Sequence, residues 1–122
     1  MTATDFAAER GYDDDAFRTR VLARTDRQQV VLGYFEPDQF IPVHAPDSDL
    51  AVTVHRGEGV VVEGGDEHPV DPGSVVAVEA GVERGIRADT RLEATLVTAP
   101  PPTDAEHEPV REGLARGVFR PG

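Results

Sequence analysis

The chain has 122 residues, of which 23 are acidic and 12 are basic, and its formal net charge is −11. This length fits one domain with a core of its own and is too short for two. Every basic residue is an arginine. A strongly acidic chain without a basic cluster repels nucleic acid and anionic membranes, so we expect neither as a partner. Because cysteine is absent, disulfides, thiolate nucleophiles and thiolate metal ligands are excluded.

The excess of carboxylates is typical of a halophilic protein, because concentrated salt screens the repulsion between surface charges. We therefore interpret the chain as an acidic protein from a halophilic archaeon. Residues 1–20 carry Asp5, Glu9 and an aspartate run at 13–15 where a signal peptide has its apolar centre. No stretch approaches the roughly 20 apolar residues of a membrane-spanning helix. The sequence thus predicts a cytoplasmic location.

The first predicted segment is an N-terminal extension over residues 1–16, with a short helical piece at 5–10. From Phe17 the apolar residues alternate with polar ones, which predicts strands. One strand contains Val21, and the next covers residues 30–35. A proline-aspartate turn then precedes a strand at residues 40–44.

Short apolar runs continue at nearly even spacing, with glycine and proline turns between them. The predicted strands cover residues 50–55, 59–63, 67–70, 74–78, 84–88 and 92–98. Many short strands with such turns favour an all-β sandwich or barrel. No helix of ten or more residues alternates with them, which argues against a Rossmann-like fold. We therefore predict a β-barrel over residues 17–99.

The last predicted segment, residues 100–122, is a proline-rich linker followed by a helix. Three consecutive prolines end the strand pattern, because proline lacks the amide donor that a ladder needs. Thr103 and Glu106 then have the spacing of a capping box, and Gly117 stands at a C-cap position. These signals predict a helix over about 104–116. Its apolar face, with His107, Val110 and Leu114, is expected to pack on the barrel.

Two glycine-anchored segments resemble the motifs of the cupin family. The first is the stretch 44–57, in which His44, Pro46, Leu50 and Gly57 fall on the positions of H-x-H, E and G. The second is the stretch 72–84, in which a Pro-Gly turn is followed by Glu-Ala-Gly at 79–81 and by Arg84 where cupins have a histidine. The resemblance covers roughly residues 30–98. It implies an all-β, cupin-like double-stranded β-helix, a jelly-roll barrel, with a short C-terminal helix.

The same resemblance indicates that the metal site of the family has been lost. Among the four ligand positions only His44 is retained, since Pro46 and Leu50 have no side-chain donor. Arg84 is a permanent cation and would repel a metal ion. We therefore expect no metal cofactor and no catalytic residue of the usual family type.

One route to a metal remains open in the sequence. Asp47 or Asp49 would approach His44 if the register slipped locally, and a divalent transition metal would then bind there. A slip by one residue, however, turns the whole strand inside out and removes Leu50 from the core.

The residues left in the barrel predict a binding site. If the register holds, His44 and Arg84 point to the barrel mouth above an apolar floor that includes Val52 and Val54. A guanidinium beside an imidazole suits a carboxylate or phosphate group. We take these four residues as the candidate ligand-binding residues for a small anionic or polar molecule.

A structural interpretation of Arg84 stays open beside this one. An internal carboxylate, from Glu79 or Glu83, would neutralise the guanidinium, and His44 would then only form a hydrogen bond within the core.

The other histidines are weaker candidates for chemistry. His55 is expected on the barrel exterior, His68 in an exposed hairpin, and His107 at the edge of the C-terminal helix. A zinc site built from His55 and His68 lacks supporting spacing.

Two function classes follow. The first is a metal-independent binding or regulatory protein that works as a homodimer. Small cupins resemble one another in pairing through an outer sheet face, which implies Thr53, His55 and the strand containing Phe35 as contacts. The alternative is a cupin enzyme, an isomerase or dioxygenase-like protein, with a rearranged metal site around His44.

Overall fold

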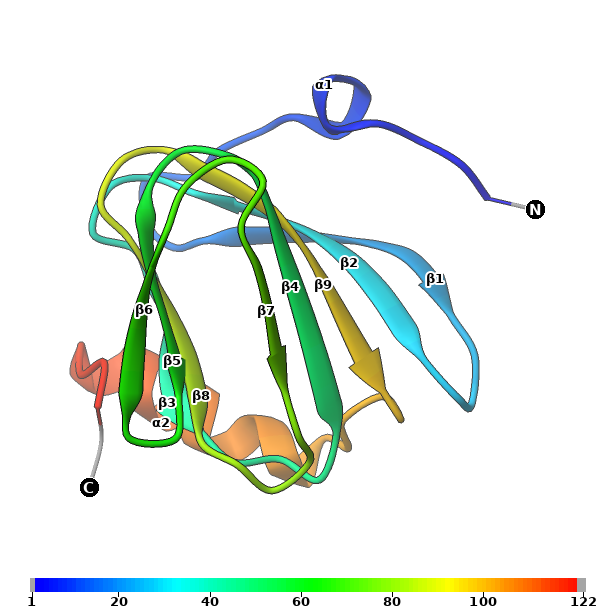
Figure 1. The fold of residues 1–122 in the computed structure, drawn as a ribbon, viewed down its shortest axis with the longest axis vertical. Helices are drawn as coiled ribbons and strands as arrows, with labels where there is room; N and C mark the ends of the chain where they lie inside the picture. Colours follow the sequence, from blue (N-terminus) through cyan, green and yellow to red (C-terminus); the bar gives the residue numbers. More distant parts are fainter. Residues whose placement is uncertain (1, 121–122) are drawn as a thin grey trace.

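The computed structural model describes residues 2–120; residue 1 and residues 121–122, which belong to the predicted terminal segments, lie outside it. Within the described part no helix is long and apolar enough to cross a membrane. The elements, shown in Figure 1, are α1 (Phe6–Glu9), β1 (Arg18–Arg24), β2 (Gln29–Phe35), β3 (Phe40–His44), β4 (Asp49–Arg56), β5 (Gly59–Glu63), β6 (Asp66–Val70), β7 (Val75–Val78), β8 (Arg84–Ala88), β9 (Leu92–Ala99), the 3-10 helix η1 (Ala105–His107) and α2 (Glu108–Arg116).

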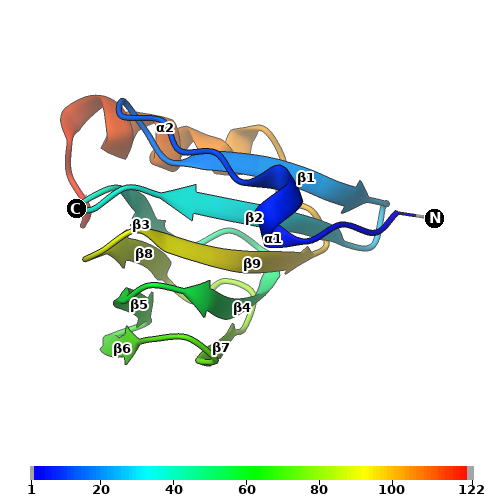
Figure 2. The same cartoon turned by 90° about the horizontal axis from the view of Figure 1, so that it is seen from above.

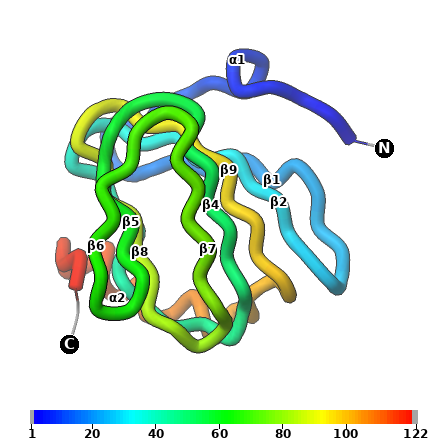
Figure 3. Tube along the Cα trace, viewed as in Figure 1, coloured from blue at the N-terminus to red at the C-terminus, as the bar shows by residue number. Residues whose placement is uncertain are grey.

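The strands form two antiparallel sheets that face each other. The five-stranded sheet has the order β1-β2-β9-β4-β7, and the four-stranded sheet has the order β3-β8-β5-β6; Figure 2 shows both along the barrel. The chain passes from the four-stranded sheet at β3 to the five-stranded sheet at β4 and returns to the first at β5. It crosses again from β6 to β7, and the Cα trace in Figure 3 shows this path. This winding is the predicted double-stranded β-helix.

Strand alternation places the core as the sequence predicts. In β4, Leu50, Val52 and Val54 are buried, while Thr53 and His55 on the opposite face are exposed. The predicted register of β4 is therefore confirmed, and no slip brings its other face inward. Gly57 ends this strand with φ 87°, a left-handed conformation that disfavours side chains.

The N-terminal segment covers the outer face of β2, which alternation alone did not indicate. Leu32 and Tyr34 point away from the barrel core and are buried nonetheless. The Tyr34 hydroxyl donates to the carbonyl of Phe6 at 2.8 Å, and the Phe6 ring stacks on His55 with centroids 4.3 Å apart. Both faces of β2 are consequently shielded from solvent.

A buried carboxylate anchors this segment to β9. Glu93 is 0% exposed. It accepts hydrogen bonds from Nε and Nη2 of Arg10, at 2.6 and 2.9 Å, and from the hydroxyl of Tyr12 at 2.5 Å. Because a buried carboxylate requires such partners, Arg10 and Tyr12 are fixed against the outer face of β9.

The C-terminal helix forms where the capping signals predict it, in two parts, η1 and α2. The amide of Glu106 donates to Oγ1 of Thr103 and the amide of Thr103 donates to Glu106, at 3.3 and 2.9 Å. The packing differs from the prediction, because Leu114 remains 36% exposed. The buried residue of α2 is Gly113, whose backbone approaches the Pro42 ring so closely that a methyl group would lie 2.6 Å from it.

Candidate ligand-binding pocket

A cavity of about 310 Å³ opens at the end of the barrel where β3 ends, β8 begins and the C-terminal segment crosses. In Figure 1 this is the end that carries α2, opposite to α1. Both sheets and the C-terminal segment contribute to its wall. The lining residues are Phe17, Thr19, Val21, Gln29, Val31, Ile41, His44, Pro46, Leu50, Arg84, Gly85, Ile86, Leu96, Thr98, Pro102, His107 and Val110. The wall is therefore mostly apolar, with a few polar groups.

Arg84 is the principal charged group of this wall. It begins β8, where it pairs with His44 on one side and with Glu63 on the other. The residue is only 3% exposed. Its Nε donates to the carbonyl of Val82 at 3.1 Å, and its Nη2 donates to the carbonyl of Glu79 at 2.8 Å. The remaining nitrogen, Nη1, is buried and has no hydrogen-bond partner in the described part of the chain.

No carboxylate of residues 2–120 lies within ion-pair distance of Arg84. The structural ion pair with Glu79 or Glu83 is thus not formed, since Glu79 contributes its main-chain carbonyl instead. The charge of Asp49 does act on Arg84 and raises its pKa, but desolvation is the larger cause and lowers that pKa. Asp49 itself accepts a hydrogen bond from the amide of Ala80 at 2.9 Å.

His44 lies beside Arg84 and is held by the backbone. Its Nδ1 is 2.8 Å from the carbonyl oxygen of Pro42, and because a carbonyl only accepts, we assign the ring proton to this nitrogen. Burial lowers the pKa of His44 below its ordinary value of 6.5, and the nearby charges of Arg84 and His107 lower it further. The imidazole is therefore neutral at neutral pH.

Four polar side chains that sequence reasoning did not assign to the pocket line it, those of Thr19, Gln29, Thr98 and His107. His107 was expected at the helix edge, yet it lines the cavity together with Val110. Thr98 contributes Oγ1, which is buried and has no partner among the described residues. The phase of β9 was the available signal for Thr98, since Leu92, Ala94 and Leu96 precede it on the same inward face.

Hydrogen bonds hold the C-terminal segment across the pocket mouth. The carboxylate of Glu106 accepts from the amide of Asp47 at 2.6 Å as well as from its capping-box partner. Ser48 is fully buried, and its hydroxyl donates to the carbonyl of Pro100 at 2.6 Å. These contacts tie the loop after β3 to the segment that carries His107.

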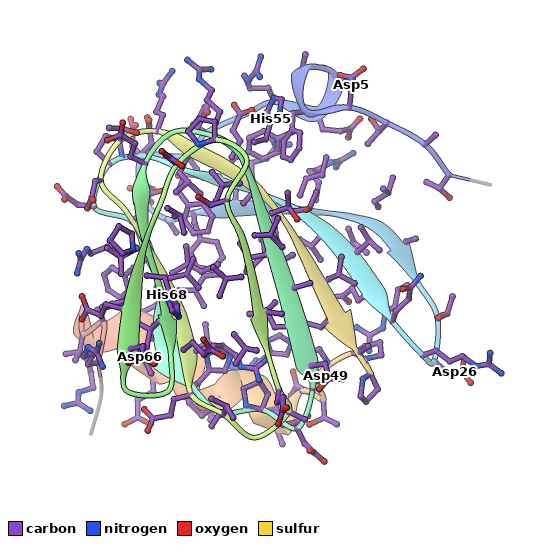
Figure 4. The ribbon with its side chains drawn as sticks, in the orientation of Figure 1. Asp5, Asp26, Asp49, His55, Asp66 and His68 are labelled. Carbon is purple, nitrogen blue, oxygen red and sulfur yellow. The ribbon has the colours of Figure 1, made fainter. Side chains whose placement is uncertain are left out.

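The remaining predicted residues lie elsewhere. Val52 and Val54 belong to the hydrophobic core and are absent from the lining of the cavity, so Leu50 is the β4 residue that contacts it. Figure 4 shows His55 next to α1 at one end of the barrel and His68 on β6, well apart from each other. His68 lies 2.9 Å from a carboxylate oxygen of Glu63.

The donor set of the pocket does not fit a transition metal. Within residues 2–120, no group of three His, Asp or Glu side chains is placed to hold a metal ion. Pro46 and Leu50, at two of the four cupin ligand positions, line the same cavity as His44 and supply no donor atom. At the fourth position stands the guanidinium of Arg84, which repels cations.

The comparisons with known proteins agree with this architecture. Protein-family models and curated protein sequences give no match. Among solved structures, the protein TT1209 from Thermus thermophilus has a TM-score of 0.79 at 27% identity, over 84% of this chain and 100% of that one. An RmlC-like cupin from Desulfovibrio desulfuricans has a TM-score of 0.75 at 26% identity, over 83% and 98%. KdgF from Halomonas sp. has a TM-score of 0.71 at 18% identity, over 80% and 94%.

The protein therefore has the cupin-like double-stranded β-helix fold. The solved structures that share this fold include RmlC-like cupins and a cupin superfamily protein, at 19–26% identity. The fold implied by the two glycine-anchored segments is confirmed. An activity does not follow from it, because this fold supports many functions.

Proposed function

We propose that this protein binds a small anionic or polar molecule in the barrel pocket, without a transition metal, in a binding or regulatory role. The observation that carries the proposal is that Arg84 lines the cavity while its buried Nη1 has no hydrogen-bond partner within residues 2–120. A carboxylate or a phosphate group presents the acceptor oxygens that a guanidinium binds best.

The energetic cost of this arrangement supports a ligand. Leaving a buried donor without a partner costs about 1–3 kcal/mol, and more when the group is charged. Both buried side-chain polar atoms without a partner in the described residues, Nη1 of Arg84 and Oγ1 of Thr98, belong to residues that line this one cavity. A ligand that forms hydrogen bonds with these two atoms would remove the free-energy penalty of burying them unpaired.

Ligand-dependent thermal unfolding tests the proposal. A panel of carboxylates and phosphates should raise the midpoint, because a ligand that binds only the folded state stabilises it. Arg84→Ala should abolish the rise. Arg87→Ala is the matched control, since Arg87 lies on the same strand, is half-exposed and stacks on Phe119 away from the pocket. If no compound in the panel shifts the wild-type midpoint, the proposal is wrong.

Metal analysis tests the second part of the proposal, that the protein works without a transition metal. Protein purified without a histidine tag should contain no stoichiometric transition metal. A stoichiometric metal that disappears in His44→Ala would replace the binding role with the metal-dependent enzyme as the better interpretation.

We also propose that two copies pair through the outer face of the five-stranded sheet, at β4 and β7. Ala51 pairs with Ala77 and Thr53 with Val75, and all four side chains are uncharged and point outward. Val75 is 66% exposed. In a chain with net charge −11, an uncharged surface is where a second copy approaches with the least repulsion. The β2 part of the predicted contact is unavailable, because Phe35 faces the core and the N-terminal segment covers the outer side.

A further inference from the structure

The charges around the pocket set the charge of its ligand. Of the described lining residues, Arg84, His44 and His107 are the titratable ones, and no Asp or Glu is among them. Arg84 contributes one permanent positive charge, and His44 is neutral at neutral pH because its pKa is lowered. A dianion would bring a second charge into an apolar wall without a fixed counterion, which is costly. Arg84 is the permanent cation among the described lining residues, and a monoanion matches its charge.

The wall sets the character of the rest of the ligand. Apolar side chains from both sheets and from α2 surround the cavity, among them Phe17, Val31, Ile41, Ile86, Leu96 and Val110. Besides Arg84, the polar residues of the described lining are Thr19, Gln29, Thr98, His44 and His107. These are too few for a sugar or another densely hydroxylated molecule, whose remaining polar groups would lose their water without finding partners. The apolar wall stabilises a compact hydrocarbon body through burial of apolar surface.

The size of the cavity limits that body. A volume of about 310 Å³ is at the small end of ligand pockets. At about 30 Å³ per water molecule of liquid volume, it corresponds to about ten non-hydrogen atoms. A short branched acid or a single aromatic ring with a carboxylate has this size.

We infer that the pocket binds a monocarboxylate with a compact apolar body, with its carboxylate at Nη1 of Arg84 and its body against the inner faces of β1, β2 and β9. The inference rests on the proposed function and narrows it to one ligand class. Val110 and His107 of the C-terminal segment also line the site.

Isothermal titration calorimetry with a graded series of acids tests the ligand class. The probes are acetate, propanoate, butanoate, 3-methylbutanoate and benzoate, with inorganic phosphate as the polar anion and benzamide as the neutral counterpart of benzoate. Each added methylene should lower Kd about fourfold, from about 0.8 kcal/mol per buried methylene. Benzamide should bind at least about tenfold more weakly than benzoate, because it lacks the charge that strengthens a hydrogen bond to arginine.

The outcomes separate this inference from the proposed function. If phosphate and acetate bind as tightly as benzoate, the pocket takes polar anions, so the proposed function stands and the narrower class is wrong. If no anion binds at all, both are wrong. If benzamide binds with the same Kd as benzoate, the site recognises apolar groups and not anions. The role given to Arg84 is then wrong in the proposed function and in this inference.

Two variants locate the ligand. Arg84→Met should abolish the preference of benzoate over benzamide. Val21→Ser tests the wall without a risk to folding, since Val21 is 58% exposed on the edge strand β1 and lines the cavity. The Val21→Ser substitution should raise the Kd of benzoate several-fold and leave the Kd of acetate unchanged. Equal loss for both acids would place the apolar body elsewhere and overturn the inference.

Discussion

The Nη2 of Arg84 donates to the main-chain carbonyl of Glu79 across 2.8 Å, and the carboxylate of Glu79 takes no part in the contact. The loop between β7 and β8 thereby orients the guanidinium while leaving its charge unneutralised. A carbonyl supplies a partial negative charge, whereas a carboxylate would supply a full one and would occupy the direction that a ligand needs. The contact fixes the position of the Arg84 guanidinium, which is the arrangement that the proposed anion site requires.

The first prediction concerns the stability of Arg84→Met. The substitution removes a buried charge that has no counterion and loses two hydrogen bonds to carbonyls, and these effects oppose each other. We expect the free energy of unfolding in urea to stay within about 1 kcal/mol of wild type or to rise.

Arg10→Met is the contrasting control. It removes the bidentate partner of the fully buried Glu93 and should lower the unfolding midpoint clearly. Equal destabilisation by the two substitutions would mean that Arg84 is a structural residue.

The second prediction is a pH dependence that comes from His44. The pKa of His44 lies below 6.5 in the folded state, so the unfolded chain binds the proton more readily. Stability from the neutral imidazole is therefore present above about pH 6.5 and is lost as the pH falls from there toward the lowered pKa. Urea unfolding across this range should show the loss, and His44→Gln should reduce it.

Binding of a carboxylate should reverse this behaviour. An anion next to His44 offsets the charges of Arg84 and His107, raises the pKa of His44 and draws a proton into the complex. Calorimetry in two buffers with different ionisation enthalpies measures this uptake. His68→Gln should leave the uptake intact, because His68 lies on β6 outside the pocket; loss of uptake in that variant would argue against His44.

The third prediction concerns Gly113. Alanine is usually favoured over glycine in a helix by about 1 kcal/mol. Here its methyl group would lie 2.6 and 2.7 Å from two ring carbons of Pro42, and such overpacking costs about 1–3 kcal/mol. We expect Gly113→Ala to lower stability and to weaken benzoate binding, because α2 carries Val110 into the pocket wall. Glu112→Ala, on the exposed side of α2, should change neither; a stabilised Gly113→Ala would show that α2 is not held against β3.

The fourth prediction tests the interpretation of the acidic surface. With a net charge of −11, repulsion between carboxylates destabilises the folded state at low ionic strength. The unfolding midpoint at pH 7 should therefore rise as KCl increases from about 0.1 to about 2 M, as the screening length falls from about 10 Å to below 3 Å. At about pH 4.5, where many carboxylates are protonated, the rise should be smaller. A midpoint independent of KCl at pH 7 would contradict adaptation to salt.

The fifth prediction concerns assembly. Sedimentation velocity should show a dimer for the wild type and a monomer for Thr53→Arg, which introduces a charge into the uncharged surface of β4 and β7. Asp26→Asn changes the net charge by the same amount and lies in the β1–β2 turn, away from this surface, as Figure 4 shows. It should leave the dimer intact. Dimers of Thr53→Arg, or a monomeric wild type, would reject this interface.

The sequence by itself determined the features that depend on neighbouring residues. Period-two alternation placed Leu50, Val52 and Val54 on the inner face of β4, the capping box placed the start of the C-terminal helical segment, and a left-handed glycine at Gly57 marked a strand end. For these features, the determining interactions span only a few residues and leave a visible sequence pattern. The expectation that His44 and Arg84 both face the barrel mouth came instead from the resemblance to the cupin motifs, and the structure pairs the two residues across β3 and β8.

The tertiary structure alone decided what each of these side chains meets. Glu93 is bound by Arg10, 83 residues away, and no local pattern links the two. Likewise, the choice between the carboxylate and the carbonyl of Glu79 depends on how the β7–β8 loop turns. His107 reaches the pocket only because Gly113 lets α2 approach Pro42. Pairing and burial depend on distances through space, so the unpartnered cation of Arg84 appears only once the chain is folded.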